Sequence, residues 1–350
     1  MARQRVAVIF GGRSGEHEVS VISARSVMKA LDPERWDVVP IAISRSGAWL
    51  SPEETVTGLN EGWPAFMGGG ASLLTSTGAL AALATCEAAF PLVHGTFGED
   101  GTLQGFLEMA DMPYAGAGVA ASAIGMDKAL MKALFREAGI PVPRYGVVRA
   151  WELEGDPATV HRYVEQATGY PCFVKPANGG SSVGVSRAAS REDLPSAFEA
   201  AFAYDEKAVI EEAIVGQEVE CSVLGNERPE ASITGEIEPD REFYSYESKY
   251  ATDSKTRLHI PARISEETSE AVREMAVRMY QVMGCEGYAR VDFFVRNGTE
   301  VIANEVNTIP GFTSISMYPK LWEASGIGYS DLLTRILELA LERQARRSER

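Results

Sequence analysis

The sequence predicts an α/β fold with more than one domain. Short apolar runs at residues 6–10, 37–44 and 86–93 are typical of buried strands, and the stretch 18–31 between the first two is typical of a helix. Strands that alternate with helices favour a parallel sheet covered by helices. A length of 350 residues exceeds what one hydrophobic core usually accommodates, so two or three domains are expected.

The remaining elements are predicted from the same patterns along the chain. Further helices are expected at 102–110, from 118 to about 138, and at 156–168, 266–283 and 329–342, and further strands at 146–149, 171–176, 208–212 and 218–224. Residues 51–84 show no clear period and are expected to be irregular. The polar and aromatic stretch 238–260 is predicted to be a mobile loop, and the Arg-rich end of the chain is expected to fray.

The composition limits the classes of partner. The net charge of −16 argues against nucleic acid and anionic membrane surfaces as partners. The four cysteines are scattered without C-x-x-C spacing, as expected of reduced thiols. The first apolar run is too short for a signal peptide, and the uncharged stretch 62–86 contains too much Gly, Ser and Thr for a membrane span. A cytoplasmic protein is expected.

The stretch 288–307 contains two apolar runs separated by Asn297-Gly298, which is typical of a two-residue hairpin turn. Such a turn would place three pairs of residues opposite each other: Arg296 and Thr299, Asp292 and Ala303, and Arg290 and Glu305. Because side chains alternate along a strand, four polar side chains would share one face: Arg290, Asp292, Glu305 and Asn307. Neighbours on such a face lie roughly 5 to 8 Å apart.

This polar face has two interpretations. Charged residues that alternate with apolar ones usually line a solvated sheet face. Alternatively, the three oxygen-bearing side chains share cations, and together with the guanidinium they suit Mg²⁺ that carries a nucleotide phosphate. The second strand leads directly into the turn 307–311, and loops at strand ends are common locations of functional sites. The second interpretation predicts an ATP-using enzyme.

The loop 179–184 is a candidate phosphate-binding loop. Its glycines and serines offer backbone N–H groups with little steric bulk, although a flexible surface turn has the same composition. It is not a Walker A motif, because the order Gly-Lys-Ser/Thr is absent. Lys175 precedes the loop on a strand and supplies a positive charge. Lys128 and Lys249 are isolated candidates, of a residue type that is usually solvated.

Two other glycine-rich loops follow apolar strands. The loop 11–16 lacks the G-x-G-x-x-G spacing of a dinucleotide site. Glu16 stands where this loop opens into a helix, so it either complements the helix dipole or binds a substrate ammonium group. His94 begins the loop 94–101. A lone histidine is more often structural, but its position in a glycine-rich loop makes it a candidate site residue.

Eight motifs, taken in chain order, resemble those of the D-alanine–D-alanine ligases. They are Gly11-Gly-x-Ser-x-Glu-x-Glu-Val-Ser20, His94-Gly-x-x-Gly-Glu-Asp-Gly101, Met126-Asp-Lys128, Val174-Lys-Pro176, Gly180-Ser-Ser-Val-Gly184, Lys249-Tyr250, Arg290-x-Asp292 and Glu305-x-Asn-Thr-x-Pro-Gly-x-Thr-Ser314. The similarity covers the chain from about residue 5 to 340. Each motif alone is modest, but eight in one order make the resemblance specific.

The resemblance implies an ATP-grasp fold of three α/β domains with the active site between them. Residues 1–116 would bind the first substrate, 117–210 would form the central domain, and 211–350 would bind metals and the second substrate. ATP would phosphorylate the carboxylate of one D-alanine. The amine of a second D-alanine would then attack the acyl phosphate, giving D-alanyl-D-alanine for peptidoglycan synthesis, with ADP and phosphate released. A homodimer is implied, because relatives are commonly dimers.

The resemblance also implies residue roles. Two Mg²⁺ ions, with Mn²⁺ as an alternative, would bind Asp292, Glu305 and Asn307. ATP would bind Lys128, Lys175, Ser182, Glu211, Glu212, Ile214, Glu218 and Lys249, with the adenine against 211–214 and the ribose on Glu218. Arg290 and the Gly311 N–H would stabilise the oxyanion. Glu16, with Ser181 and Tyr250, would bind the first ammonium group, and His94 would lie near the first substrate. Ser316 and the Met317 backbone would hold the second carboxylate.

Three positions bear on these roles. Glu212 replaces a lysine found in some members, so only its backbone is expected to contact adenine. Met317 stands where leucine is often found, which leaves a backbone role intact. Relatives that make the D-alanyl-D-lactate ester tend to lack Tyr250, so its presence favours the amide-forming enzyme. The loop 238–260 would act as a lid that protects the acyl phosphate from water.

Two other functions remain alternatives. One is a different ATP-grasp ligase that joins another carboxylate to another amine. The other is a nucleotide-binding regulatory protein without turnover, which the full set of metal-binding, acidic and cationic groups disfavours.

Overall fold

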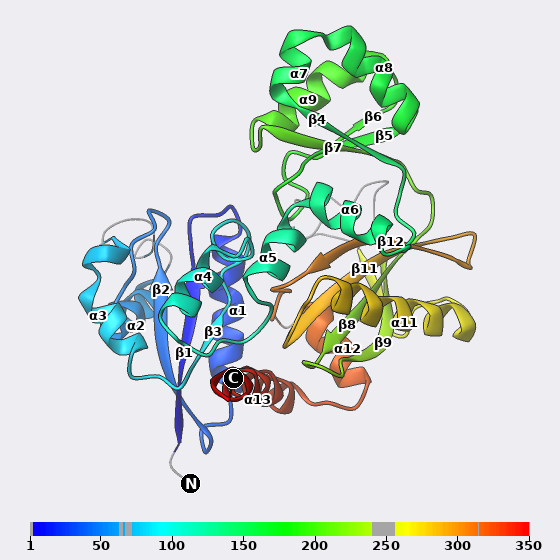
Figure 1. The fold of residues 1–350 in the computed structure, drawn as a ribbon. Helices are drawn as coiled ribbons and strands as arrows, with labels where there is room; N and C mark the ends of the chain where they lie inside the picture. The colour runs from blue at the N-terminus through cyan, green and yellow to red at the C-terminus, as the bar shows by residue number, and fades with distance from the viewer. Residues whose placement is uncertain (1–2, 63–65, 67–71, 240–255, 314, 350) are drawn as a thin grey trace.

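The computed structural model describes residues 3–62, 66, 72–239, 256–313 and 315–349, and the strands in these ranges form three sheets (Figure 1). One sheet belongs to the amino-terminal part of the chain, one to the middle and one to the carboxy-terminal part. Each sheet with the helices around it is called here the amino-terminal, the middle or the carboxy-terminal unit. The predicted α/β class is therefore confirmed. No helix in these ranges is long and apolar enough to cross a membrane.

The amino-terminal sheet is parallel, as predicted, with the order β2-β1-β3. Its elements are β1 (Gln4–Gly11), α1 (His17–Ala30), β2 (Trp36–Ile43), α2 (Pro52–Glu61), the 3-10 helix η2 (Leu73–Thr75), α3 (Thr77–Leu83), β3 (Ala88–Pro91) and α4 (Thr102–Met109). The expectation that residues 51–84 are irregular was wrong for the stretches that form α2, η2 and α3, whereas residues 63–65 and 67–71 lie outside the described residues. The Ser51 hydroxyl accepts the Glu54 N–H while the Glu54 carboxylate accepts the Ser51 N–H, and this capping box starts α2.

The single helical stretch predicted up to residue 138 is two helices, α5 (Val119–Met126) and α6 (Lys128–Glu137). The Asp127 side chain accepts hydrogen bonds from the N–H groups of Ala129 and Leu130, at 3.0 and 3.1 Å. It therefore caps a new helix instead of continuing the old one.

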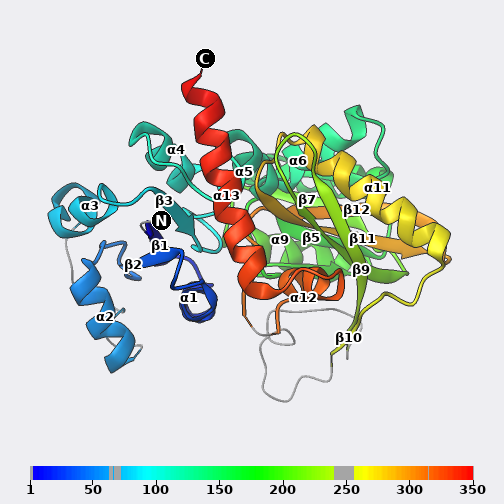
Figure 2. The same ribbon diagram turned by 90° about the horizontal axis from the view of Figure 1, so that it is seen from below.

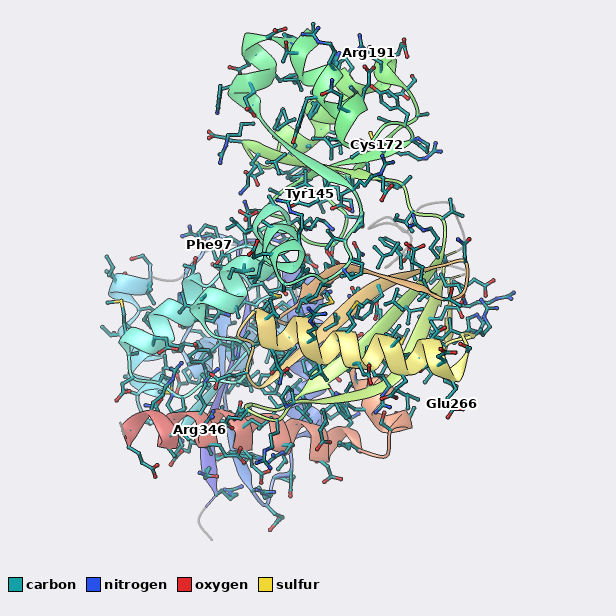
Figure 3. All side chains as sticks on the ribbon, turned by 45° about the vertical axis from the view of Figure 1, so that its right-hand side comes forward. Phe97, Tyr145, Cys172, Arg191, Glu266 and Arg346 are labelled. Atoms are coloured by element: carbon teal, nitrogen blue, oxygen red, sulfur yellow. The ribbon has the colours of Figure 1, made fainter. Side chains whose placement is uncertain are left out.

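The middle sheet is antiparallel, with the order β4-β7-β5-β6. Its elements are β4 (Tyr145–Arg149), α7 (Ala150–Gly155), α8 (Pro157–Ala167), β5 (Cys172–Pro176), β6 (Ser186–Ala188), η3 (Arg191–Asp193), α9 (Leu194–Phe202) and β7 (Lys207–Glu212). Figure 3 shows Cys172 on this sheet and Arg191 beyond it, near the covering helices, whereas Tyr145 lies on the side of α6. There the Arg136 guanidinium is 5.4 Å from the centre of the Tyr145 ring.

The carboxy-terminal sheet has the order β10-β9-β8-β11-β12 and is antiparallel. Its elements are β8 (Gln217–Leu224), β9 (Glu230–Glu238), β10 (Arg257–His259), α11 (Glu266–Val282), β11 (Tyr288–Arg296), β12 (Glu300–Asn307), α12 (Met317–Ala324) and α13 (Tyr329–Ser348). Part of the predicted loop 238–260 is thus strand β10, which pairs with β9. Residues 240–255 lie outside the described residues.

The helix α13 joins the first and last units. It crosses from the carboxy-terminal sheet to the amino-terminal one (Figures 1 and 2), where its Leu332 and Ile336 share a core with Val6 and Phe90. The expected fraying after residue 342 was wrong, because the Arg343 guanidinium donates to the carbonyl oxygens of residues 114 and 116, each at 2.6 Å. These contacts hold the end of the helix, which Figure 3 marks with Arg346.

The β11–β12 hairpin differs from the predicted register in two ways. Arg296 pairs with Glu300, so the loop 297–299 has one residue more than predicted. By itself this longer loop would place Asn304 opposite Asp292, but a bulge in the ladder brings Glu305 there instead and Asn307 opposite Arg290. The two departures add up to a shift of two residues, which is one full period of a strand, so the predicted polar face forms even though the predicted pairs were wrong.

The division into domains 1–116, 117–210 and 211–350 stays a prediction. Its second boundary falls inside β7 (Lys207–Glu212), a strand of the middle sheet.

Candidate active site

Two adjoining cavities lie where the three units meet. The first, here called the lysine cavity, has a volume of about 170 Å³ and lies between the middle and carboxy-terminal sheets. The second, here called the carboxylate cavity, has a volume of about 160 Å³ and is also lined by loops of the amino-terminal unit. Both are lined by Gly180, Ser181, Glu220, Ile237, Arg290 and Glu305.

The lysine cavity is built around a buried glutamate. Lys175 on β5 donates to one carboxylate oxygen of Glu211 at 2.7 Å, and Lys132 of α6 lies 3.2 Å from the other. Lys128, one helical turn before Lys132, donates to the Gly179 carbonyl oxygen at 2.5 Å. Burial alone would raise the pKa of Glu211, but the two lysines that flank it lower that pKa to about 2. Glu211 is therefore ionised and holds Lys175 at the cavity wall.

The loop 179–184 links the middle unit to the amino-terminal one. Ser181 and Ser182 both have a positive φ, of 51° and 59°, which turns the loop tightly over the cavities. The Ser181 hydroxyl donates to a Glu16 carboxylate oxygen. A Cβ added at Gly180 would stand 2.8 Å from the other oxygen of Glu16, so a side chain at this position would push the Glu16 carboxylate away.

The polar face of the hairpin forms the boundary between the two cavities. The Arg290 guanidinium donates to both oxygens of Asp292 at 2.7 Å, and it lies 3.0 Å from Glu220. The Asn307 amide also donates to Asp292, at 2.9 Å. Burial by itself lowers the pKa of Arg290, but the charges of Asp292 and Glu220 raise it well above the ordinary value. Arg290 is therefore a permanent cation at this boundary.

The carboxylate cavity contains acidic groups in a buried setting. Glu99 accepts the N–H groups of Gly95 at 2.6 Å and Ile309 at 3.3 Å. Burial, followed by the charge of Glu16, raises the pKa of Glu99 to about 8 against these two hydrogen bonds. Burial also lowers the pKa of His94, although Glu16 and the Ile309 carbonyl act in the opposite sense. At neutral pH, Glu99 is mostly protonated and His94 is neutral.

The far wall of the carboxylate cavity is the loop between β12 and α12. The Ser316 hydroxyl accepts the Thr313 N–H at 3.0 Å, and Met317 begins α12. A Cβ added at Gly311 would lie 2.7 Å from the Ser316 oxygen, so glycine is needed where the loop folds on itself. The first N–H groups of a helix are a favourable site for an anion such as a carboxylate.

Comparison with protein families identifies both halves of the chain. A model described as "D-ala D-ala ligase N-terminus" matches residues 5–117, and one described as "D-ala D-ala ligase C-terminus" matches residues 134–338. The chain belongs to the D-alanine–D-alanine ligase family. The resemblance seen in the eight motifs is therefore confirmed, and members of this family use ATP as a co-substrate.

Individual relatives of this D-alanine–D-alanine ligase family agree. The D-alanine–D-alanine ligase of Halothermothrix orenii is 48% identical over 98% of this chain and 99% of its own. The solved D-alanine–D-alanine ligase of Coxiella burnetii is 33% identical, with a TM-score of 0.82 over 99% of this chain and 98% of that one. The VanG D-Ala:D-Ser ligase of Enterococcus faecalis is 35% identical, with a TM-score of 0.83 over 97% and 100% of the two chains. The predicted ATP-grasp fold is confirmed.

Every predicted site residue that the structure describes lines one of the two cavities. The lysine cavity holds Lys128, Lys175, Ser182, Glu211, Glu212, Ile214, Glu218 and Asp292; the carboxylate cavity holds Glu16, His94, Asn307, Gly311, Ser316 and Met317; Ser181, Arg290 and Glu305 line both. The Glu212 carboxylate is engaged by the backbone and guanidinium of Arg144, at 2.9 and 2.8 Å, and the Glu212 N–H donates to the Arg144 carbonyl oxygen at 2.9 Å. Lys249 and Tyr250 lie outside the described residues.

Three residues of the ligase site were not predicted: Lys132, Glu99 and Glu220. Lys132 stands four residues after Lys128, a spacing that places both on one helix face. Glu99 belongs to the His94–Gly101 motif, and Glu220 alternates with Glu218 on a predicted strand. The signals were therefore present, but which of these acids would be buried depended on contacts between units.

The residues at the boundary suit a divalent metal ion. Among the described residues, no group of three or more His, Cys, Asp or Glu side chains is arranged to hold a metal. The predicted set consists instead of two carboxylates and the Asn307 amide, which are oxygen donors of the kind that Mg²⁺ prefers. A carboxylate oxygen has two acceptor positions, so the Asp292–Arg290 pair leaves capacity for a cation.

Proposed function

We propose that this chain joins two D-alanines into D-alanyl-D-alanine at the expense of ATP, by way of an acyl phosphate, and releases ADP and phosphate. Its membership of the D-alanine–D-alanine ligase family supports this function and its place in cell-wall precursor synthesis. The observation that carries it is the shared wall of the cavities: Ser181, Arg290 and Glu305 line both. A nucleotide in the first would place its terminal phosphate beside an amino acid in the second.

The lysine cavity is the proposed ATP site. Lys128 and Lys175 would neutralise the phosphates, with Lys249 as a third cation, since phosphoryl transfer depends mainly on positioning and charge. The loop with Ser182 would cover the phosphates. Adenine would lie against residues 211–214, and Glu218 would bind the ribose.

The proposed metal site is the pair of carboxylates Asp292 and Glu305 with Asn307. Two Mg²⁺ ions, or Mn²⁺ in their place, would supply positive charge that offsets the phosphate charge during transfer. Lys128 lies 4.0 Å from Glu305, so the chain itself already provides a cation there.

The carboxylate cavity is the proposed amino-acid site. Glu16, held by Ser181, would accept the first ammonium group, with Tyr250 completing the network. The second amine attacks the acyl phosphate carbon, and charge then develops on the carbonyl oxygen. Arg290 and the Gly311 N–H would stabilise that oxyanion.

The remaining contacts and the setting of the enzyme are part of the same proposal. Ser316 and the first N–H of α12, from Met317, would hold the second carboxylate. We propose a cytoplasmic homodimer. The four free cysteines are compatible with a reducing compartment.

The test is a competition assay with ATP, Mg²⁺ and D-alanine, D-serine and D-lactate together, with products identified by mass spectrometry. The proposal expects one phosphate per D-alanyl-D-alanine. Dominant D-alanyl-D-serine would assign the chain to the activity named for the Enterococcus relative. ADP formation with L-alanine but not D-alanine would indicate a different ATP-grasp ligase, and ATP binding without turnover would indicate a regulatory protein.

A variant at the proposed lid residue examines the acceptor further. Tyr250→Phe is expected to weaken dipeptide synthesis and to admit a hydroxy acid. An unchanged ratio of amide to ester product would contradict a role of Tyr250 in acceptor choice.

A further inference from the structure

The loop between β12 and α12 is held by side chains of the amino-terminal unit. His94 Nδ1 lies 3.0 Å from the Ile309 carbonyl oxygen, and the Ile309 N–H donates to Glu99 at 3.3 Å. The loop 94–101 thus engages both the backbone N–H and the carbonyl oxygen of Ile309. The backbone at residue 309 is fixed against the amino-terminal unit.

A second chain of hydrogen bonds reaches the loop on the other side of Gly311. The Phe312 N–H donates to the Ser23 hydroxyl oxygen at 3.4 Å, and that hydroxyl lies 3.2 Å from His94 Nε2. One proton arrangement satisfies every member: Nδ1–H of His94 donates to Ile309, and Ser23 O–H donates to Nε2. This requires the neutral imidazole, the form that burial of His94 favours.

The two fixed points lie on either side of Gly311, whose N–H is the proposed oxyanion donor. Oxyanion donors act through exact placement, and a displacement of about 1 Å can lower a rate a hundredfold. Gly311 has no side chain to pack, so its position depends on its neighbours. Those neighbours are held by residues that belong to the unit binding the first D-alanine.

We propose that Ser23, His94 and Glu99 are positioning residues that place the Gly311 N–H for the oxyanion. The inference rests on the proposed function. It adds that the oxyanion site of the carboxy-terminal unit depends on the amino-terminal unit, so the second chemical step requires both units to be in contact. In this network His94 acts through Ile309, since it is only 4% exposed and both of its ring nitrogens are engaged.

Ser23→Ala is the decisive variant, because Ser23 is fully buried and lines neither cavity. Ser20→Ala is the matched control. Ser20 lies on the same helix and is equally buried, and among the described residues its hydroxyl bonds to the backbone of its own unit, at Gly11 and Leu92. Both variants lose one buried hydroxyl, but only the first loses contact with the loop at Gly311.

The expected result is a fall in kcat of about tenfold for Ser23→Ala, with KM for ATP and D-alanine within about twofold of wild type. A tetrahedral phosphinate analogue of the dipeptide should bind about tenfold more weakly. Ser20→Ala should keep kcat within about twofold, although both variants unfold at a lower temperature. An unchanged kcat in Ser23→Ala, an equal loss in both variants, or a rise in KM for D-alanine alone would overturn the proposal.

Amide hydrogen exchange gives a readout that does not depend on activity. In Ser23→Ala the Phe312 amide should exchange faster than in wild type and in Ser20→Ala, and equal protection in all three would contradict the proposal. A wild-type protein that forms no product from D-alanine would refute the proposed function instead. These outcomes distinguish a failure of the positioning proposal from a failure of the proposed function.

Discussion

The two cavities each contain a buried glutamate, and the pKa values of the two glutamates are shifted in opposite directions. Glu211 lies between Lys132 and Lys175, and its pKa falls to about 2. Glu99 lies near Glu16 with two backbone N–H groups as partners, and its pKa rises to about 8. Burial raises the pKa in both cases, so the nearby charges decide the outcome. The lysine cavity is therefore suited to an anion. In the carboxylate cavity Glu99 keeps its proton, and Glu16 is the acid that can bind an ammonium group.

The largest expected effect is at the boundary that joins the cavities. Asp292→Asn should lower turnover about a thousandfold, because a metal contribution of several kcal/mol is lost. The fold should persist, since Arg290 keeps Glu220 as a partner. The turnover of Asp292→Asn and of a second variant, Glu305→Gln, is measured by phosphate release, and their folding is measured by thermal unfolding. Near wild-type turnover in either variant would make the metal assignment wrong.

The next effect tests whether the lysine cavity depends on its buried charge pair. Lys132→Met should lower the free energy of unfolding by about 2 to 3 kcal/mol, because it removes one partner from a buried carboxylate that retains Lys175. KM for ATP should rise, since Glu211 also positions Lys175. Urea unfolding measures the stability loss.

The double variant Lys132→Met with Glu211→Gln is the control for this charge pair. It should recover part of the loss, because it removes the carboxylate charge that the single variant leaves underpaired. Strict additivity of the two single changes would show that the pair is not coupled.

The two glutamates also predict opposite dependences of stability on pH. The unfolded chain releases the Glu99 proton near its ordinary value of 4.5, whereas the folded chain keeps it to about 8, so this group lowers stability as pH rises from about 4.5 to 8. Glu211 has a folded pKa of about 2, so its stabilisation is complete above about 4.5 and is lost as pH falls towards 2.

Glu99→Gln should not show the loss that Glu99 causes as pH rises. Its free energy of unfolding minus that of wild type should therefore be larger at pH 8 than at pH 5. Urea unfolding at the two pH values provides the measurement. An identical pH profile in wild type and variant would show that Glu99 ionises normally in the folded chain.

The smallest expected effect concerns the influence of Glu16 on Glu99. Glu16→Gln removes the charge that, after burial, contributes most to the raised pKa of Glu99. The titration of Glu99, followed by carbon NMR of its labelled carboxyl, should move to lower pH but stay above the ordinary value. A titration that does not move would leave burial and the charge of Glu305 as the causes of the raised pKa.

The hairpin illustrates how far sequence patterns reach. The alternation along 288–307 was sufficient to place Arg290 with Asp292 on one face of β11 and Glu305 with Asn307 on one face of β12, because alternation is a local property of strands. That the two pairs share a face depended on the loop length and the bulge together. The exact pairs were not predictable, since loop length and the bulge depend on how the sheet closes against its neighbours. The capped break at Asp127 was also local, and attention to capping would have found it.

The sequence by itself determined the family and the α/β class, and it predicted a set of site residues whose described members line the two cavities, because motif order, residue type and strand alternation are written along the chain. Only the tertiary structure decided which acids are charged. Glu211 and Glu99 look alike in the sequence, and their ionisation depends on lysines and carboxylates brought from other elements. The same holds for the contacts of Ser23 and His94 with the loop at Gly311, which join residues more than 200 positions apart. Electrostatic energies depend on distance in space and on burial, and neither is encoded by spacing along the chain.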